Sequence, residues 1–99
     1  MQIAPEILKA VEELGKRLVS GQYVCAGKQC VRSLGGLLAI DISELPRTNP
    51  DGSVREFEYA VHYWFDGYVV RAWFSGSGEL ESIHIERSAV ECDCACGYG

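Results

Sequence analysis

Five cysteines fall into two groups, one early in the chain and one near its end: Cys25 and Cys30, then Cys92, Cys94 and Cys96. Thiolates are ligands for zinc and other soft metals, and two thiols at the right distance form a disulfide. Two of the tail cysteines together with the early pair would complete a tetrahedral site of four thiolates around zinc, with one thiol left over. The first hypothesis is therefore a cysteine-based structural clamp, made either by zinc or by disulfides.

The early pair lies in a predicted tight hairpin with Gly27 at the first position of a type II′ turn. This turn places Cys25 opposite Cys30 at a non-hydrogen-bonded pair, where the Cα atoms are about 4.5 Å apart. That distance lies at the short end of the range for a disulfide, and the same hairpin would also present both thiolates to one metal ion. Disulfide, metal site and free thiols all stay open.

The tail reads Cys92-Asp93-Cys94-Ala95-Cys96-Gly97, so its alternating thiols would face one side of an extended chain. Over this short stretch it resembles the C-terminal Cys-Gly-Cys-Gly of the A-type iron–sulfur carrier proteins. Asp93 and Ala95 depart from the glycine pattern of that family, and the upstream cysteine lacks its Gly-Gly-Cys-Ser-Gly setting. The resemblance implies an iron–sulfur cofactor as an alternative that ranks behind zinc.

A second group of chemically capable residues alternates along three predicted strands and shares one face of the sheet: His62, Trp64, Arg71, Trp73 and His84. Tryptophan is enriched at interaction sites, and an arginine flanked by histidines suits an anion. We predict a binding face here. It is either an interface with another protein or with a second copy of the chain, or a platform for a small molecule. The alternative is that residues 23–32 cover this face. The pattern positions no nucleophile for a catalytic triad, so a non-enzymatic role is favoured over an enzyme.

The strands that position this face follow from two turns. Residues 54–65 alternate, and Asp66-Gly67 is a strong signal for a two-residue hairpin turn. Such a turn places Phe65 opposite Tyr68 and makes every pair on one face apolar, which supports the register. A second turn at Ser77-Gly78, with Gly76 opposite Glu79, continues the apolar face and places His84 opposite Arg71.

A further strand is predicted upstream because Leu38, Ile40 and Ile42 alternate. The segment from Ser43 to Gly52 contains two prolines and an Asp-Gly pair, so it is predicted to be a long surface loop.

The N-terminal segment predicts an amphipathic helix over about residues 5–20. Its apolar positions recur at helical spacing and form one stripe: Ile3, Ile7, Val11, Leu14 and Leu18. Pro5 suits the start and Gly21 the position past the end. Gly15 within the helix costs about 1 kcal/mol relative to Ala, and we attribute its presence to a close approach of the helix to the sheet.

Together these elements predict an α+β fold in a single domain of residues 1–99, with the helix packed on an antiparallel meander of four to five strands. The strands are expected at about 23–26, 29–33, 37–43, 54–65, 68–75 and 79–87, followed by a cysteine-rich tail at 88–99.

The composition excludes several classes of function. The net charge is −5 and the nine basic residues are scattered, so no direct binding of nucleic acid is expected. No apolar run is long enough for a membrane span, and the N-terminus lacks the pattern of a secretory signal. We therefore expect no membrane partner and a cytoplasmic location.

The function predicted from these features is a small non-enzymatic interaction protein, a regulator or inhibitor of a protein partner, stabilised by the cysteine clamp. A metal or iron–sulfur carrier that uses the C-terminal cysteines is one alternative. A small-molecule binder or enzyme at the His/Arg/Trp face is the other.

Overall fold

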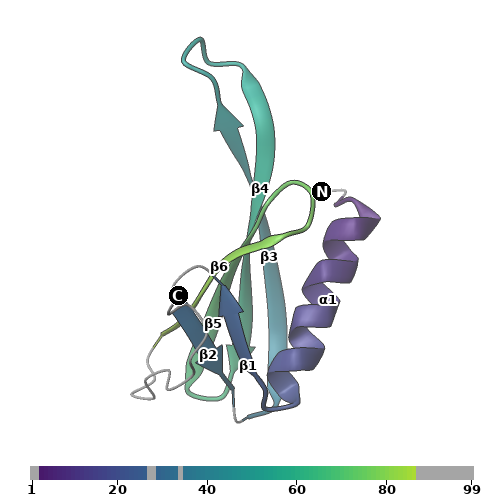
Figure 1. The fold of residues 1–99 in the computed structure, drawn as a ribbon, viewed down its shortest axis with the longest axis vertical. Coiled ribbons are helices and arrows are strands. Elements are labelled where there is room, and N and C mark those ends of the chain that lie inside the picture. The colour runs from purple at the N-terminus through teal and green to yellow at the C-terminus, as the bar shows by residue number, and fades with distance from the viewer. Residues whose placement is uncertain (1–2, 27–28, 34, 87–99) are drawn as a thin grey trace.

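The computed structural model describes residues 3–26, 29–33 and 35–86 of the chain. The described residues form one helix and six strands, and Figure 1 shows how they are arranged. In chain order these are α1 (Pro5–Val19), β1 (Tyr23–Ala26), β2 (Gln29–Arg32), β3 (Leu37–Thr48), β4 (Val54–Phe65), β5 (Tyr68–Phe74) and β6 (Leu80–Glu86). Strands β3 to β6 make an antiparallel meander in sequence order, and β1 and β2 make a separate hairpin. The predicted α+β class is confirmed.

Helix α1 buries the predicted stripe, with Ile7, Val11 and Leu18 almost fully enclosed. Proline fits the first turn, where its missing N–H has no helical partner, and the helix stops as Gly21 takes a φ of 78°. The stripe packs on the sheet, and the hydroxyl of Tyr63 in β4 donates to the backbone oxygen of Val11 at 2.7 Å. Packing of the stripe on the sheet is therefore supplemented by one buried hydrogen bond.

The β4–β5 hairpin has the predicted register. Phe65 pairs with Tyr68 across the two-residue turn, and Val61 pairs with Ala72. Gly67 takes a φ of 90° in that turn, a conformation that glycine adopts without steric cost. The apolar face that this register creates is buried, as predicted.

The β5–β6 hairpin agrees with the prediction away from its turn, where Arg71 pairs with His84. At the turn, the predicted pairing of Gly76 with Glu79 is wrong. The backbone N–H of Ser75 donates to the oxygen of Glu79 at 2.8 Å, and the register shifts by one residue so that Glu81 has no partner on β5. The reason is a turn of three residues, 76–78, in place of the predicted two, with Gly78 in the left-handed region at a φ of 90° and a bulge at Glu81 after it.

The predicted surface loop at residues 43–52 is also wrong, because β3 continues to Thr48 and pairs with the start of β4. Pro46 does not stop the strand because β3 is the outer strand of the sheet, where a residue without an N–H is tolerated. The chain then reverses within a short turn, in which the N–H of Asn49 donates to the oxygen of Ser53 at 2.8 Å. The end of β3 and the beginning of β4 project beyond the rest of the molecule (Figure 1). We call this projection, residues 45–58, the arm.

At its other end β3 contains a bulge, which corrects the predicted alternation. Leu37 pairs with Phe65 and Ala39 with Trp64, so Leu38 has no partner and is 69% exposed. The extra residue changes the phase of the strand, and Leu37 instead of Leu38 packs against the core.

The core lies on one side of the sheet, under α1 and the β1–β2 hairpin. Val24 and Val31 of that hairpin belong to the same buried cluster as the helix stripe, and the hydroxyls of Ser33 and Tyr68 are hydrogen bonded at 2.6 Å. We call this side the covered face and the opposite side the open face. Strands β1 and β2 therefore pack on the covered face, and the alternative in which this segment covers the tryptophans is wrong.

Candidate functional site

The register places all five residues of the predicted binding face on the open face. A row of polar residues crosses the four strands through paired positions: Asp41, His62, Arg71 and His84. The neighbouring row toward the β4–β5 turn contains Trp64, Val69 and Glu86, and Trp73 lies one row away on the other side. The prediction that His62, Arg71 and His84 lie side by side is confirmed as a statement of geometry.

Trp64 is the most exposed aromatic residue of this face, with 43% of its surface accessible. Its indole N–H donates to a carboxylate oxygen of Asp41 at 3.1 Å. The imidazole of His62 stacks on the indole, with ring centroids 6.1 Å apart and planes at 20°. Two residues of the adjacent row, Asp41 and His62, therefore orient a large, half-exposed ring.

Arg71 and Glu86 form an ion pair on the same face, with Nη1 and Oε1 2.7 Å apart. The hydrogen bond from Arg71 is the largest cause that lowers the pKa of Glu86, and the positive fields of Arg71, His84 and His62 act in the same direction. Glu86 thus stays a carboxylate to a lower pH than an ordinary glutamate does.

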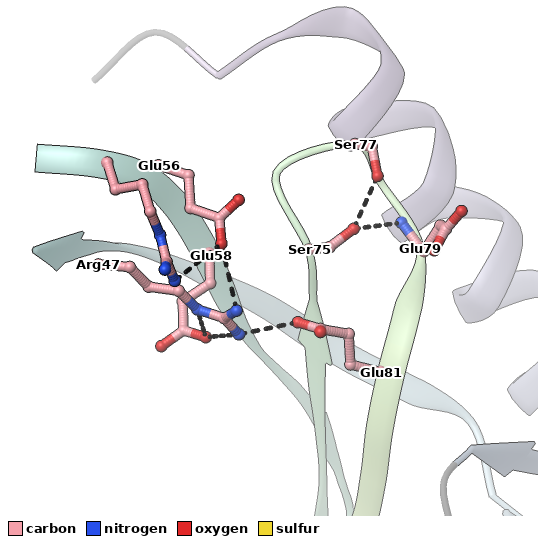
Figure 2. Close-up of polar contacts among 8 residues, drawn as sticks. Arg47, Glu56, Glu58, Ser75, Ser77, Glu79 and Glu81 are labelled. Carbon is pink, nitrogen blue, oxygen red and sulfur yellow. Dashed lines mark hydrogen bonds and ion pairs between the residues drawn. The ribbon is translucent and has the colours of Figure 1, made fainter. Parts of the chain in front are cut away.

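A second charged cluster lies where the arm meets β6, as Figure 2 shows. Arg47 of β3 donates through Nε to Glu58 at 2.7 Å, and its two Nη groups contact Glu56 at 3.3 Å and Glu81 at 3.0 Å. Glu81 is the bulge residue of β6, so the cluster links the arm to the far strand of the sheet. The hydrogen bond to Glu58 is the main cause that raises the pKa of Arg47.

The open face is acidic. Three arginines, Arg47, Arg71 and Arg55, stand against five carboxylates, which gives a net charge of −2 with neutral histidines. Arg55 is included because it contacts Glu56 at 3.6 Å. The five carboxylates are those of Asp41, Glu56, Glu58, Glu81 and Glu86. An acidic surface with an exposed indole attracts cationic groups and repels another surface like itself.

A shallow pocket of about 200 Å³ lies at the β4–β5 end of this face. The described residues that line it come from both sides of the turn and from the end of β6: Trp64, Phe65, Gly67, Tyr68, Val69 and Glu86. The pocket thus combines an aromatic ring, aliphatic surface and one carboxylate.

The early cysteines lie where the sequence predicted them, since Cys25 pairs with Cys30 in the β1–β2 register. Cys92, Cys94 and Cys96 lie outside the described residues. Within residues 3–26, 29–33 and 35–86, no group of three or more Cys, His, Asp or Glu side chains could hold a metal ion. Zinc and iron–sulfur binding stay predictions that depend on the tail.

Two parts of the open face were missed by the sequence prediction, namely Asp41 and the Arg47 cluster. The alternation of β3 contained a signal for the first, since Asp41 lies between Ile40 and Ile42 and must face the opposite way. The partner strand was not known, because the β3–β4 connection was taken for a loop.

Comparison with protein-family models, with curated proteins and with solved structures finds no match. The helix in the described part of the chain is too short and too polar to cross a membrane.

Proposed function

We propose that this chain is a small non-enzymatic interaction protein whose open face binds a basic segment of a partner protein. The observation that carries the proposal is the combination of a half-exposed, oriented Trp64 with a net charge of −2 on one face of the sheet. Aromatic anchors supply contact area, and complementary charge supplies attraction and orientation. A regulator or inhibitor that covers a basic site on a larger protein would have this character.

The charge also guides the choice of partner. Two copies packed face to face would bring two acidic surfaces together, and like charges across an interface cost several kcal/mol. A partner that carries Lys and Arg is attracted to the acidic face and avoids this repulsion. The partner favoured by the charge is therefore a basic protein segment. Self-association through the two tryptophans is tested separately by light scattering.

Catalysis is the weaker interpretation of the same residues. Asp41 lies in the row with His62, but it accepts a hydrogen bond from Trp64. Arg71, which lies between the two histidines of the row, is paired with Glu86. These contacts suit a fixed recognition surface better than a proton relay, which needs a base within reach of a nucleophile.

The cysteine clamp is a disulfide in this proposal. Cys25 lies opposite Cys30 in the β1–β2 register, and this pairing supports a disulfide between the two. Such a bond would tie together the hairpin that covers part of the core. Mass spectrometry after thiol alkylation, with and without prior reduction, tests this bond. The Cys30→Ser variant should expose one additional alkylatable thiol at Cys25, and unchanged labelling of Cys25 would exclude the pairing.

The binding proposal can be tested with the intrinsic fluorescence of the protein, because both of its tryptophans lie on the open face. The probe is a short peptide that alternates Arg with Ser, and the control is a peptide that alternates Glu with Ser. We expect the arginine peptide to shift the emission and to lose affinity as salt is added, since exposed charge pairs are screened. The glutamate peptide should have no effect.

Two results would overturn the proposal. One is equal response to both peptides, or response to neither. The other is a stable dimer by light scattering that becomes a monomer when Trp64 and Trp73 are replaced by serine, since the face would then be an interface between copies.

A further inference from the structure

The pocket at the end of the open face has the components of a site for one positively charged side chain. Trp64 and Glu86 lie on either side of Val69, which pairs with both in the register. Val69 is almost fully buried, so it forms an apolar floor between the ring and the carboxylate. A volume of about 200 Å³ suits the aliphatic stem and head group of a single long side chain.

The chemistry of the two walls selects a cation. An indole ring attracts ammonium and guanidinium groups within about 6 Å of its centre. His62 stacks on Trp64, so a ligand reaches the indole from the pocket. On the opposite wall, Glu86 is kept ionised by its positively charged surroundings, and it offers a carboxylate to the same cation.

In the free protein this carboxylate already has a partner, because Arg71 donates to Glu86 at 2.7 Å. The side chains of both residues are 38% exposed, so the pair is accessible to a competing guanidinium from outside. A carboxylate has two oxygens and accepts several hydrogen bonds, so Glu86 can bind a second cation. The positive charge of Arg71 nevertheless weakens the attraction of Glu86 for that cation. Arg71 is therefore an internal competitor for the incoming cation.

We infer that the pocket between Trp64 and Glu86 receives one Arg or Lys side chain of the basic partner segment, with Arg71 setting its affinity. The inference rests on the proposed function and names the point at which the partner is anchored. It assigns opposite effects to the two members of one ion pair, which a purely structural role of that pair would not produce.

The experiment measures the affinity of the dye-labelled arginine–serine peptide by fluorescence anisotropy for the full chain and four variants. Glu86→Gln should weaken binding about threefold to tenfold, and Trp64→Leu about threefold to fivefold. Arg71→Gln should strengthen binding, because it releases the carboxylate of Glu86. Trp73→Phe, one row away, is the matched control and should bind as the wild type does.

A second peptide, with citrulline in place of each arginine, keeps the shape and removes the charge. It should bind the wild type at least tenfold more weakly, and it should not distinguish Glu86→Gln from the wild type.

The outcomes separate the two proposals. No binding of the arginine peptide to the wild type contradicts the proposed function itself. Binding that is unchanged in both Glu86→Gln and Trp64→Leu, or weakened in Arg71→Gln, leaves the acidic face as the binding surface but overturns the pocket as its anchor point.

Discussion

The two faces of the sheet hold side chains of the same strands in opposite environments, one buried and one exposed. On β4, Tyr63 and Trp64 are adjacent in sequence, yet Tyr63 is fully buried under α1 while Trp64 is 43% exposed. On the covered face, side chains are fixed by packing and by a few buried hydrogen bonds. On the open face they are fixed by ion pairs and ring contacts that leave the groups accessible. The period of two in a strand thus places a buried core residue next to an exposed aromatic residue in the same strand.

The largest contrast is expected from truncation of these two neighbours. Tyr63→Ala should lower the free energy of unfolding by about 3–5 kcal/mol, because it opens a cavity in the core and removes the bond to Val11. Trp64→Ala should cost about 1 kcal/mol or less, since it removes a half-exposed ring. Urea denaturation of both variants measures the difference, and equal losses would mean that the open face contributes to the core.

A smaller effect with a pH signature comes from Tyr63→Phe, which keeps the ring and removes the hydroxyl. Near neutral pH it should cost about 0.5–1.5 kcal/mol for the lost hydrogen bond. Burial raises the pKa of Tyr63 above its ordinary value of about 10. Its contribution is therefore complete below about pH 10 and declines as the pH rises further, by up to about 1.4 kcal/mol per pH unit.

The advantage of the wild type over Tyr63→Phe should accordingly shrink or reverse in alkaline solution. Tyr59 also has a raised pKa, through burial and then through Glu44, but it is present in both proteins and cancels in the comparison. Unfolding measured from neutral to alkaline pH provides the test. A constant difference over that range would show that Tyr63 ionises as easily in the folded chain as in the unfolded one.

The smallest effect should come from Gly15, where the helix meets the sheet. An added Cβ would lie 3.5 Å from the ring of Tyr63 and 3.7 Å from Leu37, which is ordinary contact. The helix does approach the sheet here, but it leaves room for a methyl group. Gly15→Ala should stabilise the protein by about 0.5–1 kcal/mol through helix propensity and the reduced entropy of the unfolded chain. A lower melting temperature would show that the covered face is packed more tightly than these distances indicate.

The covered face was predictable because periodicity and turn chemistry agree there. Asp66-Gly67 determines one register, that register makes an apolar face, and the helix has a stripe that matches it. Each signal is local, and together they leave one consistent arrangement. The row of His62, Arg71 and His84 followed from the same register without additional information.

The other half of the open face was less predictable because it depends on irregular strand geometry. A bulge has no strong signature in sequence. The register shifts at Leu38 and Glu81 could therefore not be predicted from those residues. Pro46 indicated a loop in the sequence, but an outer strand tolerates a proline because no neighbouring strand needs its N–H. The Arg47 cluster depends on two separate features, the continuation of β3 to Thr48 and the bulge at Glu81 in β6. Neither was predicted from the sequence.

The irregularities of β3 also bear on how the molecule behaves in concentrated solution. An outer strand of twelve residues is a potential template for pairing with the same strand of another molecule. In β3 the bulge at Leu38, the missing N–H of Pro46 and the charge of Arg47 each interrupt that template. The strand that completes the acidic face is thereby protected against edge-to-edge aggregation.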